Sequence, residues 1–147
     1  MRRLIKAAII SGIIVVVFFG YLLTVGANFD RSKVRPLSQE DRKYISNEDA
    51  KKSVDAALFD IKTQLFVASY DSSRMGVYVS YIKPETVHYQ KYGGGTKVIP
   101  ERAFLPDSSP VIGVGFDSQT GGAVPEHPTF GVWIEPGTYR VLGAAGD

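Results

Sequence analysis

The chain has 147 residues, of which 22% are charged and 44% apolar, and these values are ordinary for one folded domain. The composition excludes a largely disordered chain, a collagen-like repeat and a polytopic transporter. There is no cysteine, which excludes a disulfide framework, a thiolate zinc site and an iron–sulfur cluster. The net charge of +2 does not indicate a nucleic-acid-binding protein.

Positive charge is concentrated at the N-terminus, where Arg2, Arg3 and Lys6 precede the first acidic residue. Taking these three from the 17 Lys and Arg residues leaves 14, against 15 Asp and Glu, so the rest of the chain carries a net charge of −1. Residues 1–6 therefore form a basic segment ahead of a nearly neutral body.

Residues 7–27 contain no charge and are apolar on every face of a helix. At 1.5 Å per residue this segment is about 31 Å long, which matches the hydrocarbon core of a bilayer. Tyr21 lies near its outer end, where an amphipathic ring suits the membrane interface. We expect residues 7–27 to form a single transmembrane helix that acts as a signal anchor.

A cleavable signal peptide is the alternative, because Val25 and Ala27 are small residues at the −3 and −1 positions of a cleavage after Ala27. The apolar run is longer than the roughly 7–15 residues usual in such peptides, so the uncleaved anchor is favoured. We expect a cytoplasmic N-terminus and an extracytoplasmic body. The basic residues Arg31, Lys33 and Arg35 leave a cytoplasmic body as the alternative orientation.

Residues 28–45 are polar, mixed in charge and interrupted by Pro36, which predicts a juxtamembrane linker. Ser38 and Asp41 resemble a capping box, so we expect the linker to end in a short helix. The remaining residues, 46–147, are predicted to form the folded domain.

A clear helix is predicted from Ser46 to about Ala68. Ser46 is a good N-cap, and Asp49 occupies the third helical position. One apolar stripe with helical spacing follows, formed by Ala50, Val54, Ala57, Leu58, Ile61 and Leu65. This pattern predicts an amphipathic helix that packs on a sheet.

The second half of the chain is typical of short strands and turns, since 12 of the 15 glycines and seven of the eight prolines lie beyond Met75. It predicts about five strands, including one hairpin formed by 76–82 and 86–92 and another formed by 129–134 and 138–142. Further strands are predicted near 97–99 and over 111–116. The predicted fold is α+β, with one helix on an antiparallel sheet, and a β-sandwich or partial jelly roll is the alternative.

Two glycines, Gly113 and Gly115, lie on one face of the predicted strand 111–116. Because glycine has no side chain, we expect another backbone to approach this face closely.

The sequence contains little that indicates catalysis. The spacing of His88 and His127 is not that of a metal site, and no nucleophile elbow or phosphate loop is present. Glu126 and His127 stand between two prolines, which makes this loop a weaker candidate for a contact site. No cofactor or metal is predicted.

Five of the eight tyrosines fall between Tyr70 and Tyr92. Strand alternation predicts that Tyr78 and Tyr92, together with His88, lie on the face of the sheet away from the helix. Tyrosine is enriched at binding surfaces, so these three residues are the predicted partner-binding site. The alternating set Val77, Val79 and Tyr81 should instead face the helix.

These features predict a membrane-anchored, non-enzymatic interaction or assembly module of the cell envelope or of a membrane-associated particle. Its expected partners are the bilayer, through residues 7–27, and a protein or further copies of itself, but not nucleic acid. One alternative is an envelope-acting enzyme or ligand-binding protein using His127, Glu126, Asp117 and Glu101. The other is a secreted domain released by cleavage after Ala27.

Overall fold

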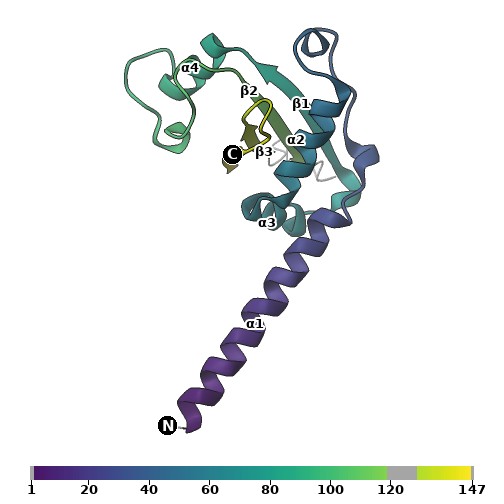
Figure 1. The fold of residues 1–147 in the computed structure, drawn as a ribbon, viewed down its shortest axis with the longest axis vertical. Coiled ribbons are helices and arrows are strands. Elements are labelled where there is room, and N and C mark those ends of the chain that lie inside the picture. The colour runs from purple at the N-terminus through teal and green to yellow at the C-terminus, as the bar shows by residue number, and fades with distance from the viewer. Residues whose placement is uncertain (1, 119–128, 147) are drawn as a thin grey trace, which may run out of the picture.

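The computed structural model describes residues 2–118 and 129–146, and Figure 1 shows a long N-terminal helix that projects from an α+β head. The helices are α1 (Arg2–Ala27), α2 (Asn47–Phe59), α3 (Ile61–Ser69) and α4 (Pro84–Tyr92). The strands are β1 (Met75–Ile82), β2 (Val111–Ser118), β3 (Thr129–Ile134) and β4 (Val141–Gly146). Short 3-10 turns cover Arg31–Lys33, Asp41–Lys43, Ser72–Arg74 and Pro100–Arg102. The predicted α+β class is confirmed.

The strands form one antiparallel sheet in the order β1-β2-β3-β4. Helix α2 crosses the inner face of this sheet, as Figure 1 shows. The centre of the core is a row of paired valines, Val79, Val114 and Val132, all of them buried. Val77 is also buried in this core and Tyr81 packs against it, so the predicted inward face of β1 is confirmed.

The sheet has four strands over the described residues, where about five were predicted. The hairpin of β3 and β4 is confirmed, but its second strand begins at Val141 rather than near residue 138. Gly137 and Tyr139 have positive φ angles of 83° and 55°, so the chain is still turning at these positions. No strand forms at 97–99.

The predicted strand 86–92 is wrong, because these residues belong to helix α4. Pro84 fits the first turn of a helix, where its missing N–H costs nothing, and Glu85 follows in the same turn. Gly93 ends the helix in the left-handed conformation, with φ of 57°. The alternation of residues 86–92 therefore favoured a strand, whereas the residues at the two ends of the segment, Pro84 and Gly93, favoured a helix.

The predicted single helix from Ser46 to about Ala68 is two helices that meet at Asp60. The Asp60 carboxylate accepts hydrogen bonds from the backbone N–H groups of Lys62 (3.0 Å) and Thr63 (3.1 Å), and so caps α3. A short acidic side chain that competes for backbone donors breaks a helix that the apolar stripe alone would continue. The break lets α3 lie beside α1 (Figure 1).

Residues 28–45, predicted to be a linker, lie along the edge strand β1. The backbone N–H of Arg35 donates to the carbonyl of Val77 (2.7 Å), and the Asp41 carboxylate accepts from the N–H of Tyr81 (2.7 Å). The N–H of Asp41 donates to Ser38 Oγ (3.1 Å), as the capping pattern predicted. This segment therefore satisfies groups that an uncovered sheet edge would leave exposed.

Helix α1 has a free part and a docked part. Its side chains from Ala8 to Tyr21 are all exposed, whereas Leu22 and Gly26 are buried against the head, as is Phe29 just beyond the helix. The apolar stretch Ala8–Ala27 is long enough and apolar enough to cross a membrane. The head thus packs directly on the last turns of this helix.

The docked part depends on a glycine. A Cβ at Gly26 would lie 2.4 Å from the backbone carbonyl oxygen of Leu58, so only glycine allows this approach. The same carbonyl accepts a buried hydrogen bond from Gln64 Nε2 (3.0 Å). Because both partners of the contact are backbone, neither can rotate away.

Gly26→Ala should therefore separate α1 from the end of α2 and lower the stability of the head by about 1–3 kcal/mol. Gly20→Ala is the matched control, because nothing lies within 4 Å of a Cβ at that position. Thermal unfolding of the full chain in detergent measures both. Equal melting temperatures for the two variants would contradict the docked arrangement.

The start of α2 is tied to the turn between β3 and β4 through Asp49. In a capping box, Asp49 Oδ2 accepts from the N–H of Ser46 (2.8 Å), while Ser46 Oγ accepts from the N–H of Asp49 (3.1 Å). Tyr139 Oη donates to Asp49 Oδ1 (2.5 Å). The bond that the Ser46 hydroxyl donates to Asp49 Oδ2 (2.6 Å), followed by those from Tyr139 and from the Ser46 N–H, lowers the pKa of Asp49 from 3.8 to about 2.

A carboxyl whose pKa is lower in the folded state stabilises the fold at every pH above the pKa it has in the unfolded chain. This stabilisation is lost as the pH falls through the pKa of the folded state. Between about pH 4 and pH 2 the wild type should lose about 1 kcal/mol more of its unfolding free energy than Asp49→Asn does, a figure reduced for solvent screening. Denaturant unfolding across this range provides the test. Parallel pH profiles for the wild type and the variant would contradict it.

Candidate binding face on the outer side of the sheet

The outer face of the sheet, opposite α2, combines exposed aromatic surface with glycine. Strand alternation places Tyr78 and Ser80 of β1 on this face, opposite Gly115 and Gly113 of β2. The next strand continues the row with Gly131, the partner of Gly115. Because Gly113, Gly115 and Gly131 have no side chains, the middle of this face is recessed relative to the residues around it.

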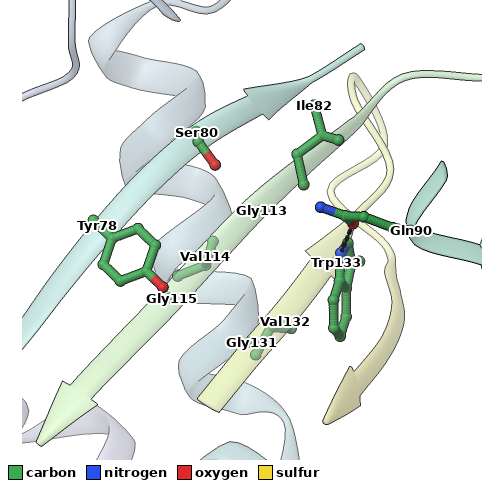
Figure 2. Close-up of a pocket in the computed structure, with 10 residues that line it drawn as sticks. All are labelled: Tyr78, Ser80, Ile82, Gln90, Gly113, Val114, Gly115, Gly131, Val132 and Trp133. Carbon is green, nitrogen blue, oxygen red and sulfur yellow. Dashed lines mark hydrogen bonds between the residues drawn. The ribbon is translucent and has the colours of Figure 1, made fainter. Parts of the chain in front are cut away.

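The ring of Tyr78 lies flat over Gly115, as Figure 2 shows. A Cβ at Gly115 would be 2.0 Å from Tyr78 Cζ, so the glycine is required for this ring position. Tyr78 is 42% exposed, and its hydroxyl makes no hydrogen bond within the described residues. The predicted outward orientation of Tyr78 is confirmed. The expected close approach at the β2 glycines comes from β1 side chains rather than from another backbone.

Trp133 forms the other wall of this region, and the tip of its ring borders Gly131, as Figure 2 shows. Its Nε1–H donates to Gln90 Oε1 of α4 (3.2 Å). The Phe104 ring packs at 5.6 Å, and the Arg102 guanidinium lies 5.7 Å from the centre of the indole. Trp133 is therefore held rigidly between the sheet and α4.

Between the two aromatic side chains lies an open hollow of about 170 Å³, here called the outer trough. It is lined by Tyr78, Ser80, Ile82, Gln90, Gly113, Val114, Gly115, Gly131, Val132 and Trp133. None of these residues is charged. The outer trough can therefore offer aromatic contact and neutral hydrogen-bonding groups, but no ion pair.

Val87 of α4 and Leu105 cover the other part of the outer face. They pack with Val111 and Trp133 in a second, smaller apolar cluster. This cluster explains why only part of the face is open, and it positions Gln90 at the end of the outer trough.

The structure does not bring the other two predicted partner-binding residues to the sheet. Tyr92 and His88 lie one turn apart on α4, with their rings 4.6 Å apart. Tyr92 Oη donates to Asp107 Oδ1 (2.7 Å), and Lys91 Nζ lies 2.9 Å from the same oxygen. The bond from Tyr92, followed by that from Lys91, lowers the pKa of Asp107, and the Tyr92–Asp107 bond raises the pKa of the Tyr92 hydroxyl.

The groups considered for catalysis do not form a site in the part of the chain that the structure describes. Glu126 and His127 lie outside the described residues. Asp117, at one end of β2, lies 4.0 Å from Arg35, while Glu101 is exposed on the 3-10 turn Pro100–Arg102. Among residues 2–118 and 129–146, no group of three acidic or histidine side chains could hold a metal ion.

Sequence reasoning missed Trp133 and Gln90. Trp133 was the only tryptophan in a predicted strand, which is a usable signal, but its orientation follows from contacts with α4. The alternating pattern of residues 86–92 places Gln90 in a strand, so it does not predict the approach of Gln90 to the indole.

Comparison with known proteins found no match among family models, curated protein sequences or solved structures. The candidate site is therefore interpreted from its own geometry.

The packing of Tyr78 on Gly115 can be tested by a double-mutant cycle. Gly115→Ala should cost about 1–3 kcal/mol, because the new methyl group displaces the ring, and much less in a Tyr78→Ala background. Gly131→Ala is the matched control, since a Cβ there meets the Trp133 ring at an ordinary 3.4 Å. Chemical unfolding of the four proteins in the cycle measures the coupling, and additive effects would contradict the contact.

Proposed function

We propose that the chain is a membrane-anchored, non-enzymatic binding module of the cell envelope or of a membrane-associated particle. In this proposal the outer trough holds an uncharged, extended segment of a partner protein. The observation that carries it is the exposed Tyr78 ring, fixed over Gly115 and facing a rigid Trp133 across a surface without charge.

The chemistry of the outer trough supports a polypeptide partner. Tyr78 supplies apolar area and a free hydroxyl at low entropic cost, which are properties of residues that dominate binding energy. Ser80 and Gln90 add neutral polar groups of the kind that pair with a peptide backbone. A nucleic acid would need cations against its phosphates, and the lining has none.

The docking of α1 supports an anchor that is retained. Cleavage after Ala27 would remove Leu22 and Gly26, which are buried against the head, together with the partly buried Val25. A removable signal peptide has no reason to form part of the folded domain. The positive charges at Arg2, Arg3 and Lys6 favour a cytoplasmic N-terminus and an extracytoplasmic head.

Tyr78→Ala should weaken association with the partner by about 2 kcal/mol or more, roughly 30-fold in Kd. Tyr89→Ala is the matched control, because Tyr89 is 64% exposed on α4 and does not line the outer trough. The measurement is recovery of a stoichiometric partner by each full-length variant from detergent-solubilised membranes, followed by titration of that partner.

Thermal unfolding of the same variants separates binding from folding. Tyr78→Ala should leave a folded head, because the ring packs on the surface rather than in the core. If both tyrosine variants recover the partner equally, the outer trough is not the binding site.

A further inference from the structure

We propose that the corner between α2 and α3 is a second membrane contact, in which Phe59, Ile61 and Leu65 rest in the interface of the bilayer that α1 spans. These three residues are here called the lipid corner. The inference deepens the proposed function and rests on its membrane anchor.

The lipid corner is apolar and exposed. Phe59 is 73% exposed, Ile61 40% and Leu65 42%, although Ile61 and Leu65 belong to the predicted stripe whose other members, in α2, are buried. Lys62 is exposed beside them, and the only acidic group in the corner, the half-buried Asp60 carboxylate, is engaged by the N–H groups of Lys62 and Thr63. Exposed apolar side chains beside a lysine are typical of segments that lie in a membrane interface.

The position of the lipid corner relative to α1 is fixed by contacts. Phe59 directly follows Leu58, whose carbonyl touches Gly26 of α1. A hollow between α1 and α3 is lined by residues from Tyr21 to Phe29 on one side and by Val67 and Ala68 on the other. Figure 1 also shows α3 as the part of the head that lies beside the upper end of α1. The corner is therefore level with residues 21–29.

Helix length places this level at the membrane surface. The part of α1 in which every side chain is exposed ends at Tyr21, and residues 7–21 span only about 22 Å, less than the roughly 30 Å of a hydrocarbon core. Extension to Ala27 supplies about 31 Å. The hydrocarbon boundary on the head side therefore falls between Tyr21 and Ala27, the part of α1 that the head packs against.

A shift of α1 along its own axis that would lift the head away from this boundary is opposed by the charges at the other end of the helix. Such a shift would pull Lys6, Arg3 and Arg2 into the hydrocarbon, at a cost of about 2.5–3.5 kcal/mol for each charge near its centre. The charged end of α1 thus keeps the lipid corner at the interface. Contact there removes exposed apolar surface from water and holds the head in one orientation.

The absence of cysteine allows single labelling sites. Full-length Val16→Cys, Phe59→Cys, Leu65→Cys and Tyr89→Cys would each carry an environment-sensitive fluorophore and be reconstituted in phosphatidylcholine vesicles. Two sets of matched vesicles would carry nitroxide groups: one near the glycerol end of the acyl chains, where they quench fluorophores in the interface, and one near the chain ends, where they quench fluorophores at the centre of the bilayer. Position 16 reports on the anchor, positions 59 and 65 on the lipid corner, and position 89 on exposed surface away from it.

We expect blue-shifted emission at positions 16, 59 and 65, with quenching by the chain-end nitroxides at position 16 and by the glycerol-end nitroxides at positions 59 and 65, and neither effect at position 89. Quenching at position 16, with 59 and 65 behaving like 89, would overturn the lipid corner and leave the anchor intact. A blue shift at 59 and 65 without quenching would mean that a second copy or another protein covers them, which also overturns the inference. No quenching at position 16 would overturn the anchor and this inference together.

Discussion

The close contact between Gly26 and the carbonyl of Leu58 determines how the molecule is organised. It joins the end of α1 to the end of α2 with no flexible stem between them. Arg31 reinforces the junction, since its guanidinium donates to the carbonyls of Ala27 (2.9 Å) and Phe29 (2.7 Å) and pairs with Asp55 of α2 (3.2 Å). A cation that satisfies the last carbonyls of a helix also interacts favourably with its dipole.

A second use of glycine shapes the outer face of the sheet. Two aromatic rings lie over glycines there, Tyr78 over Gly115 and Phe104 over Gly143, and the Trp133 ring borders Gly131. Rings that pack on the backbone of a glycine leave the space above the sheet open, whereas a side chain projecting from the same position would fill that space. Trp133 is restrained by α4 and Tyr78 only by the sheet, so one wall of the outer trough is buried and the other is exposed.

Sequence patterns failed where a local signal competed with a longer one. The alternation of residues 86–92 favoured a strand, but Pro84 and Gly93 favoured a helix, and the helix formed. In the stripe that begins at Ala50, helical periodicity continued through Asp60, yet its carboxylate captured two backbone N–H groups and ended α2. In both cases the residues at the ends of an element were more informative than the residues inside it.

The sequence by itself determined the apolar helix α1, the α+β class, the capped start of α2, the inward face of β1 and the last hairpin, because each depends on residues close together in the chain. It also indicated Tyr78 as outward-facing. Only the tertiary structure decided that Gly26 meets Leu58, that Tyr78 lies over Gly115 and that Gln90 holds Trp133. These contacts join distant segments, and which atoms meet is set by strand register and helix packing, which no local pattern encodes.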